Sequence, residues 1–285
     1  MPLPNDDDDR VHRPWDLVGK VAVVTGATRG IGRAIALHLA SRGSAVLGTH
    51  GGTSSEQQIS KVCEEVRSAN VHYGSSAPKI IFAAISLADP EAHQKLADVI
   101  QQDFDGHVDI YINNAATTDR TYPGELEPET LRKLLLWNIE TPAMMIDTLV
   151  RRRLFRHGSR IIFISSAESV RANPAVHIYA ATKAANEAMA RAYANAFGGN
   201  DPAFAFMAET TVNSVLTGLT NTQGVQQYGL KVWNDLQHSW ISTQAIPRLG
   251  EVEDVADVVG LLCGKESRSI TGAKISANGG SIPVV

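Results

Sequence analysis

Short apolar runs alternate with longer amphipathic segments along most of the chain. The runs are rich in β-branched residues and are bounded by glycine or polar positions, which is typical of strands buried in a parallel sheet. They lie at Lys20–Thr25, Ala45–Thr49, Ile80–Ala84, Val108–Asn113, Ile161–Ser165, Thr211–Val215 and Ala273–Ala277. Helical spacing of apolar residues fills the intervals, at Ile31–Ser41, Glu56–Arg67, Pro90–Asp103, Pro128–Arg153, Tyr179–Phe197 and Val252–Cys263.

This alternation predicts the fold class α/β, with a doubly wound domain around a mostly or wholly parallel, seven-stranded sheet. No internal repeat and no Pro- or Ser-rich linker divides the chain, so we assign residues 19–285 to a single domain. Residues 1–18 contain the acidic run Asp6–Asp9 and are expected to form a disordered tail. Residues 69–79 are polar and are expected to form a surface loop.

Composition and charge narrow the kinds of partner. The 285 residues are 44% hydrophobic and 20% charged with a net charge of −4, so neither nucleic acid nor an anionic membrane is expected as a partner. No segment approaches the roughly 20 apolar residues that cross a bilayer, and the first residues do not resemble a signal peptide. Cys63 and Cys263 are read as reduced thiols, and we predict no metal site. These observations together predict a cytoplasmic protein.

Glycines cluster where the first predicted strand meets the first predicted helix. The segment reads Thr25-Gly26-Ala27-Thr28-Arg29-Gly30-Ile31-Gly32. Glycines at such a junction permit a tight turn and let the backbone approach a pyrophosphate, which then faces the free amides of the helix N-terminus. Tight turns of this kind also occur without a ligand, so this segment alone leaves nucleotide binding open.

A tyrosine and a lysine lie four positions apart in the segment Tyr179-Ala180-Ala181-Thr182-Lys183. On a helix this spacing places both side chains on one face, about one turn apart. A phenol has a pKa near roughly 10 and is a poor acid at neutral pH, but a nearby ammonium favours the phenolate and lowers that pKa. The same spacing is also common in pairs on the surface of a helix, so this motif needs support from others.

That support comes from motifs elsewhere in the chain. Asn113-Asn114-Ala115-Ala116 ends the fourth predicted strand, Trp137-Asn138-Ile139 lies in the helix that follows, and Ser166 closes the fifth strand upstream of Tyr179. With the T-G-x-x-x-G-x-G turn, these motifs resemble the short-chain dehydrogenase/reductase family from about Gly19 to Gly280. The resemblance implies a Rossmann-type fold. The chain departs from the family pattern at Ser86, Ala116, Thr217 and Asn278, where the family has Asp, Gly, Pro and Asp.

The resemblance also implies a catalytic set made of Asn138, Ser166, Tyr179 and Lys183. In that family the tyrosine gives its proton to a carbonyl oxygen during reduction, and the serine hydrogen-bonds the same oxygen. Lys183 would lower the pKa of Tyr179 and hold the nicotinamide ribose, and Asn138 would anchor a water that links Lys183 to solvent. The implied activity is an NADP(H)-dependent oxidoreductase that moves hydride between nicotinamide and a carbonyl or alcohol carbon.

The type of nucleotide depends on the end of the second strand. An acidic residue there would bind the ribose 2′-hydroxyl, but residues 50–55 contain no carboxylate, and Arg29 is available to pair with a 2′-phosphate. Read alone, Arg29 is equally a solvated surface charge, and the Ser/Thr cluster at 53–55 is equally a helix N-cap. We predict NADP(H), contacted by Gly26, Thr28, Arg29, Gly30, Ile31, Gly32, His50, Ser54, Ser86, Leu87, Asn114, Ala115, Tyr179, Lys183, Gly218, Thr220 and Thr222.

A long excursion at about residues 217–247 is expected to form a lid over the substrate. Its aromatic residues Tyr228, Trp233 and Trp240 either line a pocket for a flat molecule or pack against the domain. By resemblance the partner is a small carbonyl or alcohol substrate, with polyketides, hydroxynaphthalenes and β-ketoacyl thioesters all open, and the protein forms a homodimer or homotetramer. Imine reduction, isomerisation, cyclisation and a non-catalytic nucleotide sensor are the alternatives.

Overall fold

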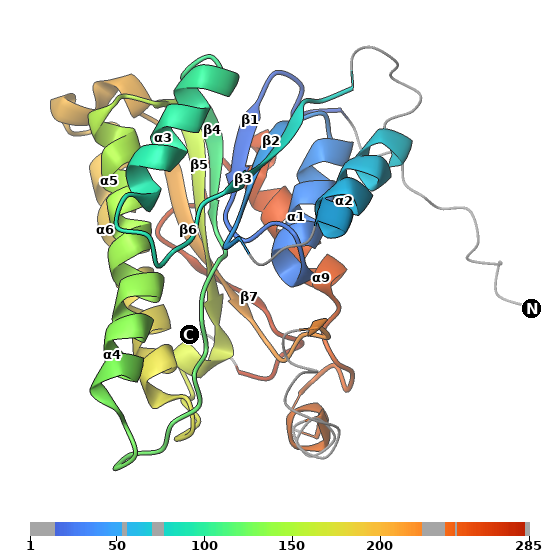
Figure 1. Ribbon diagram of the computed structural model, residues 1–285, viewed down its shortest axis with the longest axis vertical. Coiled ribbons are helices and arrows are strands. Elements are labelled where there is room, and N and C mark those ends of the chain that lie inside the picture. The colour runs from blue at the N-terminus through green and yellow to red at the C-terminus, as the bar shows by residue number, and fades with distance from the viewer. Residues whose placement is uncertain (1–14, 53–55, 70–76, 224–236, 243, 283–285) are drawn as a thin grey trace, which may run out of the picture.

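The computed structural model describes residues 15–52, 56–69, 77–223, 237–242 and 244–282. Its centre is one seven-stranded sheet in which every pairing is parallel, with the strand order β3-β2-β1-β4-β5-β6-β7 (Figure 1). The predicted α/β, Rossmann-type class is therefore confirmed. The strands are β1 (Val21–Val24), β2 (Ala45–His50), β3 (Ile80–Ala84), β4 (Val108–Asn113), β5 (Phe155–Ser166), β6 (Thr211–Thr217) and β7 (Lys274–Ala277).

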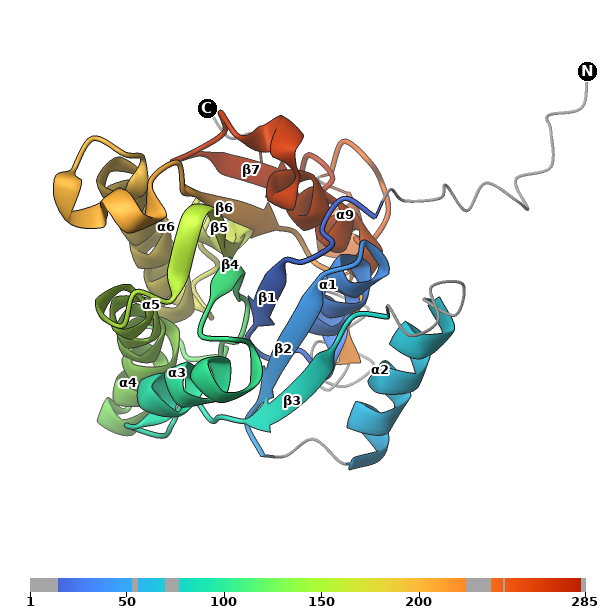
Figure 2. The same ribbon diagram turned by 90° about the horizontal axis from the view of Figure 1, so that it is seen from above.

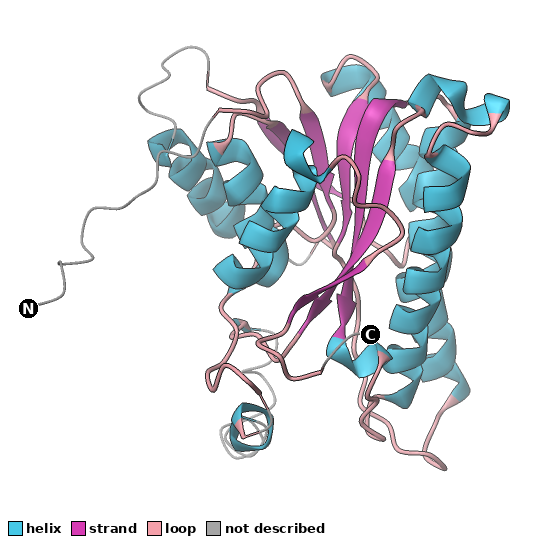
Figure 3. Ribbon diagram, turned by 180° about the vertical axis from the view of Figure 1, so that it is seen from behind, coloured by secondary structure: helices cyan, strands magenta, loops and turns pink. Residues whose placement is uncertain are grey.

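Helices cover both faces of the sheet, as the views from above and from behind show (Figures 2 and 3). One face carries α1 (Gly30–Ser41), α2 (Glu56–Ala69) and α9 (Val252–Cys263). The other carries α3 (Ala92–Asp103), α4 (Pro128–Leu135), α5 (Thr141–Arg151) and α6 (His177–Phe197). Shorter turns of helix are η2 (Leu136–Glu140), η3 (Ala167–Ser169), η4 (Pro202–Met207) and η5 (Lys265–Ser267).

Alternation along the central strands builds a separate apolar core on each face. In β1, Val21 and Val23 belong to the core under α3, α5 and α6, whereas Ala22 and Val24 belong to the core under α1 and α9. Because both faces are buried, the strands read as continuous apolar runs rather than as alternating ones, which is the pattern that predicted them.

The strand order reverses between β1 and β4, which is the feature that marks the usual ligand site in folds of this class. From β1 the chain proceeds outward to β2 and β3, and it then returns to pair β4 with β1. Doubly wound folds usually bind their ligand at the carboxyl edge of the sheet where the strand order reverses, which here is beside the loops after β1 and β4. The Gly-rich turn follows β1, and Asn114 follows β4 at this edge.

The predicted long helix Pro128–Arg153 is continuous in the structure as far as Arg151, but it contains a π-helical turn that the sequence did not predict. It consists of α4, the π-helical segment η2 and α5, which ends at Arg151. A π-helix and an α-helix differ by one residue in the hydrogen-bonded ring, so the apolar spacing of the sequence does not distinguish them.

Several predicted boundaries also move. Strand β5 begins at Phe155 rather than Ile161, with an irregular register against β4 near Val108. Residues 15–18 were assigned to the tail, yet Leu17 is buried and its amide donates to the carbonyl of Arg42. The sequence predicts Thr217 as the start of the lid, but Thr217 is the last residue of β6. Residues 1–14 and 70–76 lie outside the described residues.

Candidate functional site

The glycines of the turn after β1 are required by its geometry. Gly26 and Gly30 have φ angles of +69° and +54°, a region that residues with a side chain rarely adopt. A Cβ atom on Gly32 would lie 2.3 Å from the carbonyl oxygen of Gly26 and 2.4 Å from Nδ2 of Asn114. The start of α1 thus packs directly against the turn, and no side chain fits between them.

The Thr25 hydroxyl joins this turn to the end of β4. Its oxygen accepts hydrogen bonds from the amides of Asn114 and Ala115, each at 2.9 Å, while its proton is donated to the carbonyl of Ile112. In the other direction, Nδ2 of Asn114 donates to the carbonyl of Thr25 at 2.8 Å and to the carbonyl of Gly26 at 3.3 Å. Asn114 and Ala115 therefore hold the turn in place from the end of β4.

The turn and the first residues of α1 suit an anion. The first turn of α1 contains no acidic side chain, so its free amides and the positive end of the helix dipole are not neutralised by a carboxylate of the same turn. Arg29 precedes the helix and is exposed. Thr222 lies over the turn, because its Cγ2 is 3.5 Å from the place of a Cβ on Gly30. These residues fit the diphosphate of a dinucleotide.

The other predicted cofactor residues line the same edge. Nδ1 of His50, at the end of β2, accepts a hydrogen bond from the amide of Gly52 at 3.2 Å, and Ser54 lies outside the described residues. After β3, the Ser86 hydroxyl accepts from the amide of Ala88, and the carbonyl of Leu87 accepts from Thr141. Thr28 is buried in the turn, while Ile31 is half-buried at the start of α1.

Asn138 is placed by the π-helical segment between α4 and α5. There the amide of Thr141 reaches back to the carbonyl of Leu136, so one extra residue is accommodated. The Asn138 side chain is 1% exposed and makes a two-way pair with the loop after β4: its oxygen accepts from the Thr117 amide, and its Nδ2 donates to the Thr117 carbonyl, both at 2.9 Å. Nδ2 also lies 3.1 Å from the Thr182 hydroxyl, on the helix that carries the tyrosine.

Lys183 is a buried cation beside Tyr179. It is 3% exposed, its Nζ donates to the carbonyl of Ile164 at 2.7 Å, and Nζ lies 5.6 Å from the centre of the Tyr179 ring. Burial lowers the pKa of Lys183 to about 8, against the raising effect of Glu187. Tyr179 is half-buried in the first turn of α6. The pair therefore places a positive charge next to a partly accessible phenol.

Ser166 is the last residue of β5 and lies next to Thr217 of β6 in the sheet. Its hydroxyl oxygen accepts a hydrogen bond from the amide of Glu168 at 3.2 Å. A hydroxyl has one proton to donate, and this contact does not use it. The Ser166 hydroxyl is thus oriented as an acceptor toward the chain and retains its proton for another acceptor.

The structure joins the predicted catalytic residues through neighbouring contacts. Asn138 reaches the residue before Lys183, and Lys183 reaches the carbonyl two positions before Ser166. The sequence interpretation missed the groups that make these links, namely the Thr182 hydroxyl, the Thr117 backbone and the Ile164 carbonyl. Only Thr182 carried a signal, as a polar residue inside the Y-x-x-x-K motif. No group of His, Cys, Asp or Glu side chains in the described residues is arranged to hold a metal ion.

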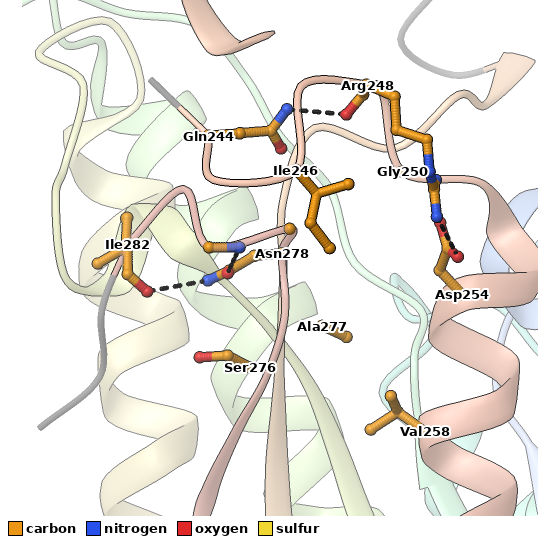
Figure 4. A pocket seen from close by; sticks show the side chains of 12 residues that line it. Gln244, Ile246, Arg248, Gly250, Asp254, Val258, Ser276, Ala277, Asn278 and Ile282 are labelled. Atoms are coloured by element: carbon orange, nitrogen blue, oxygen red, sulfur yellow. Dashed lines mark hydrogen bonds and ion pairs between the residues drawn. The ribbon is translucent and has the colours of Figure 1, made fainter. Parts of the chain in front are cut away.

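A cavity of about 480 Å³ lies between the loop 244–250, the end of β7 and α9 (Figure 4). Its polar groups satisfy one another: Arg248 pairs with Asp254, Gln244 donates to the Arg248 carbonyl, and Asn278 donates to the carbonyl of Ile282. None of the predicted catalytic residues lines it. Asn278 instead supports the turn after β6, because a Cβ on Gly218 would lie 3.1 Å from its Cα.

The predicted lid is described only in part. Thr220 is buried, donates to the carbonyl of Gly218 and bridges to Gly250, which fixes the first turn of the segment. Trp240 is half-buried, and Tyr228 and Trp233 lie outside the described residues. Their role as substrate contacts stays a prediction. No described helix is both long enough and apolar enough to span a membrane.

Comparison with known proteins gives matches along most of the chain. The family described as enoyl-(acyl carrier protein) reductase matches residues 26–281. The short-chain dehydrogenase/reductase FrzI of Cladobotryum sp is 31% identical over 280 residues, covering 96% of this chain and 100% of that protein. The short chain dehydrogenase asqE of Emericella nidulans is 34% identical over 278 residues, covering 94% and 95%. The structure of the angucycline C-6 ketoreductase LanV with bound NADP is 27% identical with a TM-score of 0.81, covering 95% and 98%.

Proposed function

This chain belongs to the short-chain dehydrogenase/reductase family of NAD(P)-dependent reductases, and we propose that it reduces a ketone or another carbonyl compound with NADPH. The observation that carries the proposal is the buried Lys183 ammonium beside the Tyr179 ring, on a helix tied to Asn138 and to the strand that ends in Ser166. A buried cation without a carboxylate in direct contact is costly, and catalytic sites are where such costs are found.

Ser166, Tyr179 and Lys183 each have a separate role at the carbonyl oxygen of the substrate. Bound NADPH would supply the hydride to the carbonyl carbon. Ser166 donates its free hydroxyl proton in a hydrogen bond to the oxygen, which stabilises the negative charge that develops there. Tyr179 transfers its phenolic proton to that oxygen, and the Lys183 ammonium stabilises the phenolate that remains. Asn138 holds the loop after β4 against α6 and so keeps this geometry.

Two observations support NADP(H) over NAD(H). The described end of β2, Thr49–Gly52, carries no carboxylate to bind a ribose 2′-hydroxyl, and Arg29 is exposed at the mouth of the nucleotide turn. A guanidinium at that place is suited to a 2′-phosphate. The similar ketoreductase LanV has NADP bound in its structure. We assign the nucleotide to the carboxyl edge of the sheet, beside the loops after β1 and β4.

The preferred substrate class in this proposal is a cyclic or polyketide-type ketone. LanV is an angucycline C-6 ketoreductase, and its fold overlays nearly the whole of this chain. Half-buried Trp240 offers a flat apolar surface in the segment after β6. We also propose a homo-oligomer, supported by two large exposed side chains, Leu135 and Met144, on the consecutive helices α4 and α5.

The test is nucleotide consumption with a panel of cyclic diketones, decalones, aromatic ketones, quinones and imines. We expect NADPH to be consumed with ketones at a kcat/KM at least about tenfold higher than NADH, and Tyr179→Phe to remove turnover while NADPH still binds. A wild-type protein that binds NADPH but oxidises it with no member of the panel would refute the reductase proposal. A clear preference for NADH would refute the nucleotide assignment, and sedimentation as a monomer would refute the oligomer.

A further inference from the structure

Helix α6 carries a third ionisable side chain in the row that begins with Tyr179 and Lys183. Glu187 follows Lys183 by the same four-residue spacing, so it lies one turn further along the same face. It is 1% exposed, although glutamate is seldom fully buried unless it is paired. The reaction as described above does not use this carboxylate.

The contacts of Glu187 surround the catalytic serine. Its Oε1 accepts a hydrogen bond from the Ser165 hydroxyl at 2.6 Å and a second one from the Ser169 hydroxyl. Ser165 directly precedes Ser166, and Ser169 ends the short helical turn that follows it. The carboxylate therefore binds both sides of the segment that presents the Ser166 hydroxyl.

The second oxygen of Glu187 reaches a different strand. Oε2 lies 2.6 Å from Nζ of Lys274, the first residue of β7, whose side chain is 32% exposed. The ammonium supplies the counter-charge that a buried carboxylate needs. Glu187 thus connects α6, the end of β5 and β7 at one point below the active site.

We propose that Glu187 is a positioning residue for the reaction: it fixes the Ser165–Ser169 segment under the substrate, and its negative charge keeps Lys183 in the ammonium form. The inference rests on the proposed reductase function. A purely structural role would not require a charge at this place, because a buried ion pair is on average no more stabilising than apolar side chains of the same volume.

The surroundings of Lys183 leave Glu187 as the charge that acts on it among the described residues. Strand β6 contributes no ionisable side chain to this face, and β5 contributes the hydroxyls of Ser165 and Ser166. Lys274 on β7 is bound to Glu187 itself. Glu168 in η3 accepts a hydrogen bond from the Asn173 amide, and it is not among the groups whose charge shifts the pKa of Lys183. From η2, Asn138 is neutral, and Glu140 faces the small cavity beside α3.

Two substitutions with opposite effects on charge, one at each end of the Glu187–Lys274 ion pair, test whether the charge of Glu187 acts on Lys183. Glu187→Gln removes the negative charge and keeps the shape, so Lys183 and Tyr179 should each lose a proton at lower pH. Lys274→Met removes the positive charge and leaves Glu187 unopposed, so both should hold their protons to higher pH. We expect the alkaline limb of kcat/KM to move down by about 0.5 to 1 pH unit in the first variant and up in the second.

Ser165→Ala tests the positioning part, because it removes one hydrogen bond and no charge. We expect kcat to fall about threefold to tenfold with the alkaline limb unchanged and the Kd for NADPH within about threefold of wild type. The Lys183 pKa is also read directly, without turnover, by NMR titration of lysine labelled at Cε and Nζ in the full chain. This second readout separates the inference from the reductase proposal, which stands or falls with wild-type turnover alone.

The inference is supported if the pKa of Lys183 falls in Glu187→Gln and rises in Lys274→Met. It is overturned if both variants keep the wild-type pKa of Lys183, or if both move it in the same direction, since a structural role gives no opposite signs. If Glu187→Gln does not fold, the Lys274→Met shift still decides the matter, because the Lys274 side chain is partly exposed and its removal leaves the hydroxyl contacts of Glu187 in place.

Discussion

Replacing Gly32 by alanine measures how tightly the nucleotide turn is built. The added Cβ would lie 2.3 Å from the carbonyl oxygen of Gly26 and 2.4 Å from Nδ2 of Asn114, where ordinary contacts begin at 3.4 Å. One of these obstacles is backbone, and the other is a side chain whose Nδ2 already donates to the carbonyls of Thr25 and Gly26. The overlap of about 1 Å is too large for bond-angle adjustment, so the turn and α1 must move apart.

The expected cost follows from the contacts that this movement breaks. Overpacking of a close interface costs about 1 to 3 kcal/mol. Loss of the Asn114 hydrogen bonds to the turn adds about 1 kcal/mol for each bond. A total near 3 kcal/mol lowers the Tm of a domain of this size by about 6 °C. Displacement of the helix N-terminus also moves its amides away from a common point where they could bind a phosphate. The Kd for NADPH should therefore rise at least tenfold, which corresponds to a loss of about 1.4 kcal/mol in binding free energy.

Two assays and one control decide this prediction. Thermal unfolding reports the stability of the apoprotein, and fluorescence of bound NADPH reports the affinity. Gly51→Ala is the matched control for stability, because a Cβ there meets no atom within 4 Å and Gly51 has no positive φ angle. If Gly32→Ala shares the Tm of Gly51→Ala and binds NADPH as tightly as wild type, the turn is looser than its contacts indicate and the reasoning is wrong.

Further predictions concern charge and the π-helical segment. Because burial lowers the pKa of Lys183 to about 8, its ammonium is lost as pH rises through that value, and reductase activity should decline there. The unfolded chain keeps this proton up to about pH 10.4. As pH rises between these two pKa values, the free energy of unfolding of wild type should therefore increase by up to about 3 kcal/mol relative to that of Lys183→Met. Parallel plots of unfolding free energy against pH for the two proteins would contradict this. Arg29→Ala should raise KM for NADPH about tenfold and leave KM for NADH unchanged, and equal effects on both would remove its assignment to a 2′-phosphate. Asn138→Ala leaves the Thr117 backbone groups unpaired and should lower stability by about 2 to 4 kcal/mol by chemical unfolding, whereas a change below about 1 kcal/mol would show that the loop does not depend on it.

Local periodicity accounts for the parts of the fold and site that could be predicted. Both faces of the sheet are covered, so its strands appear as apolar runs, and β3 and β4 begin and end where the sequence places them. The row formed by Tyr179 and Lys183 depends on helical spacing alone, and the structure places the two side chains together. The Gly-rich turn could be located because glycine at a strand–helix junction permits the positive φ angles that Gly26 and Gly30 adopt.

The features that escaped prediction depend on partners far along the chain. Glu187 reads as an ordinary surface charge until the fold brings Lys274 and Ser165 to it. The start of β5 at Phe155 was hidden because Arg156 and His157, which follow it, are exposed and polar. The π-helical turn at Asn138 leaves the apolar pattern unchanged and alters only the hydrogen bonding of the backbone.

The Thr25 hydroxyl has a consequence for how the protein is made. The Gly-rich turn belongs to the first residues of the domain that leave the ribosome, but its hydrogen bonds to Asn114 and Ala115 require the chain through β4. Such non-local contacts form late, because a long loop must close before they contribute. A nascent chain that stops before Asn114 therefore has the glycine motif but lacks the hydrogen bonds that hold the turn in place. Capture of NADPH during synthesis would thus mark the moment at which the two halves of the sheet have joined.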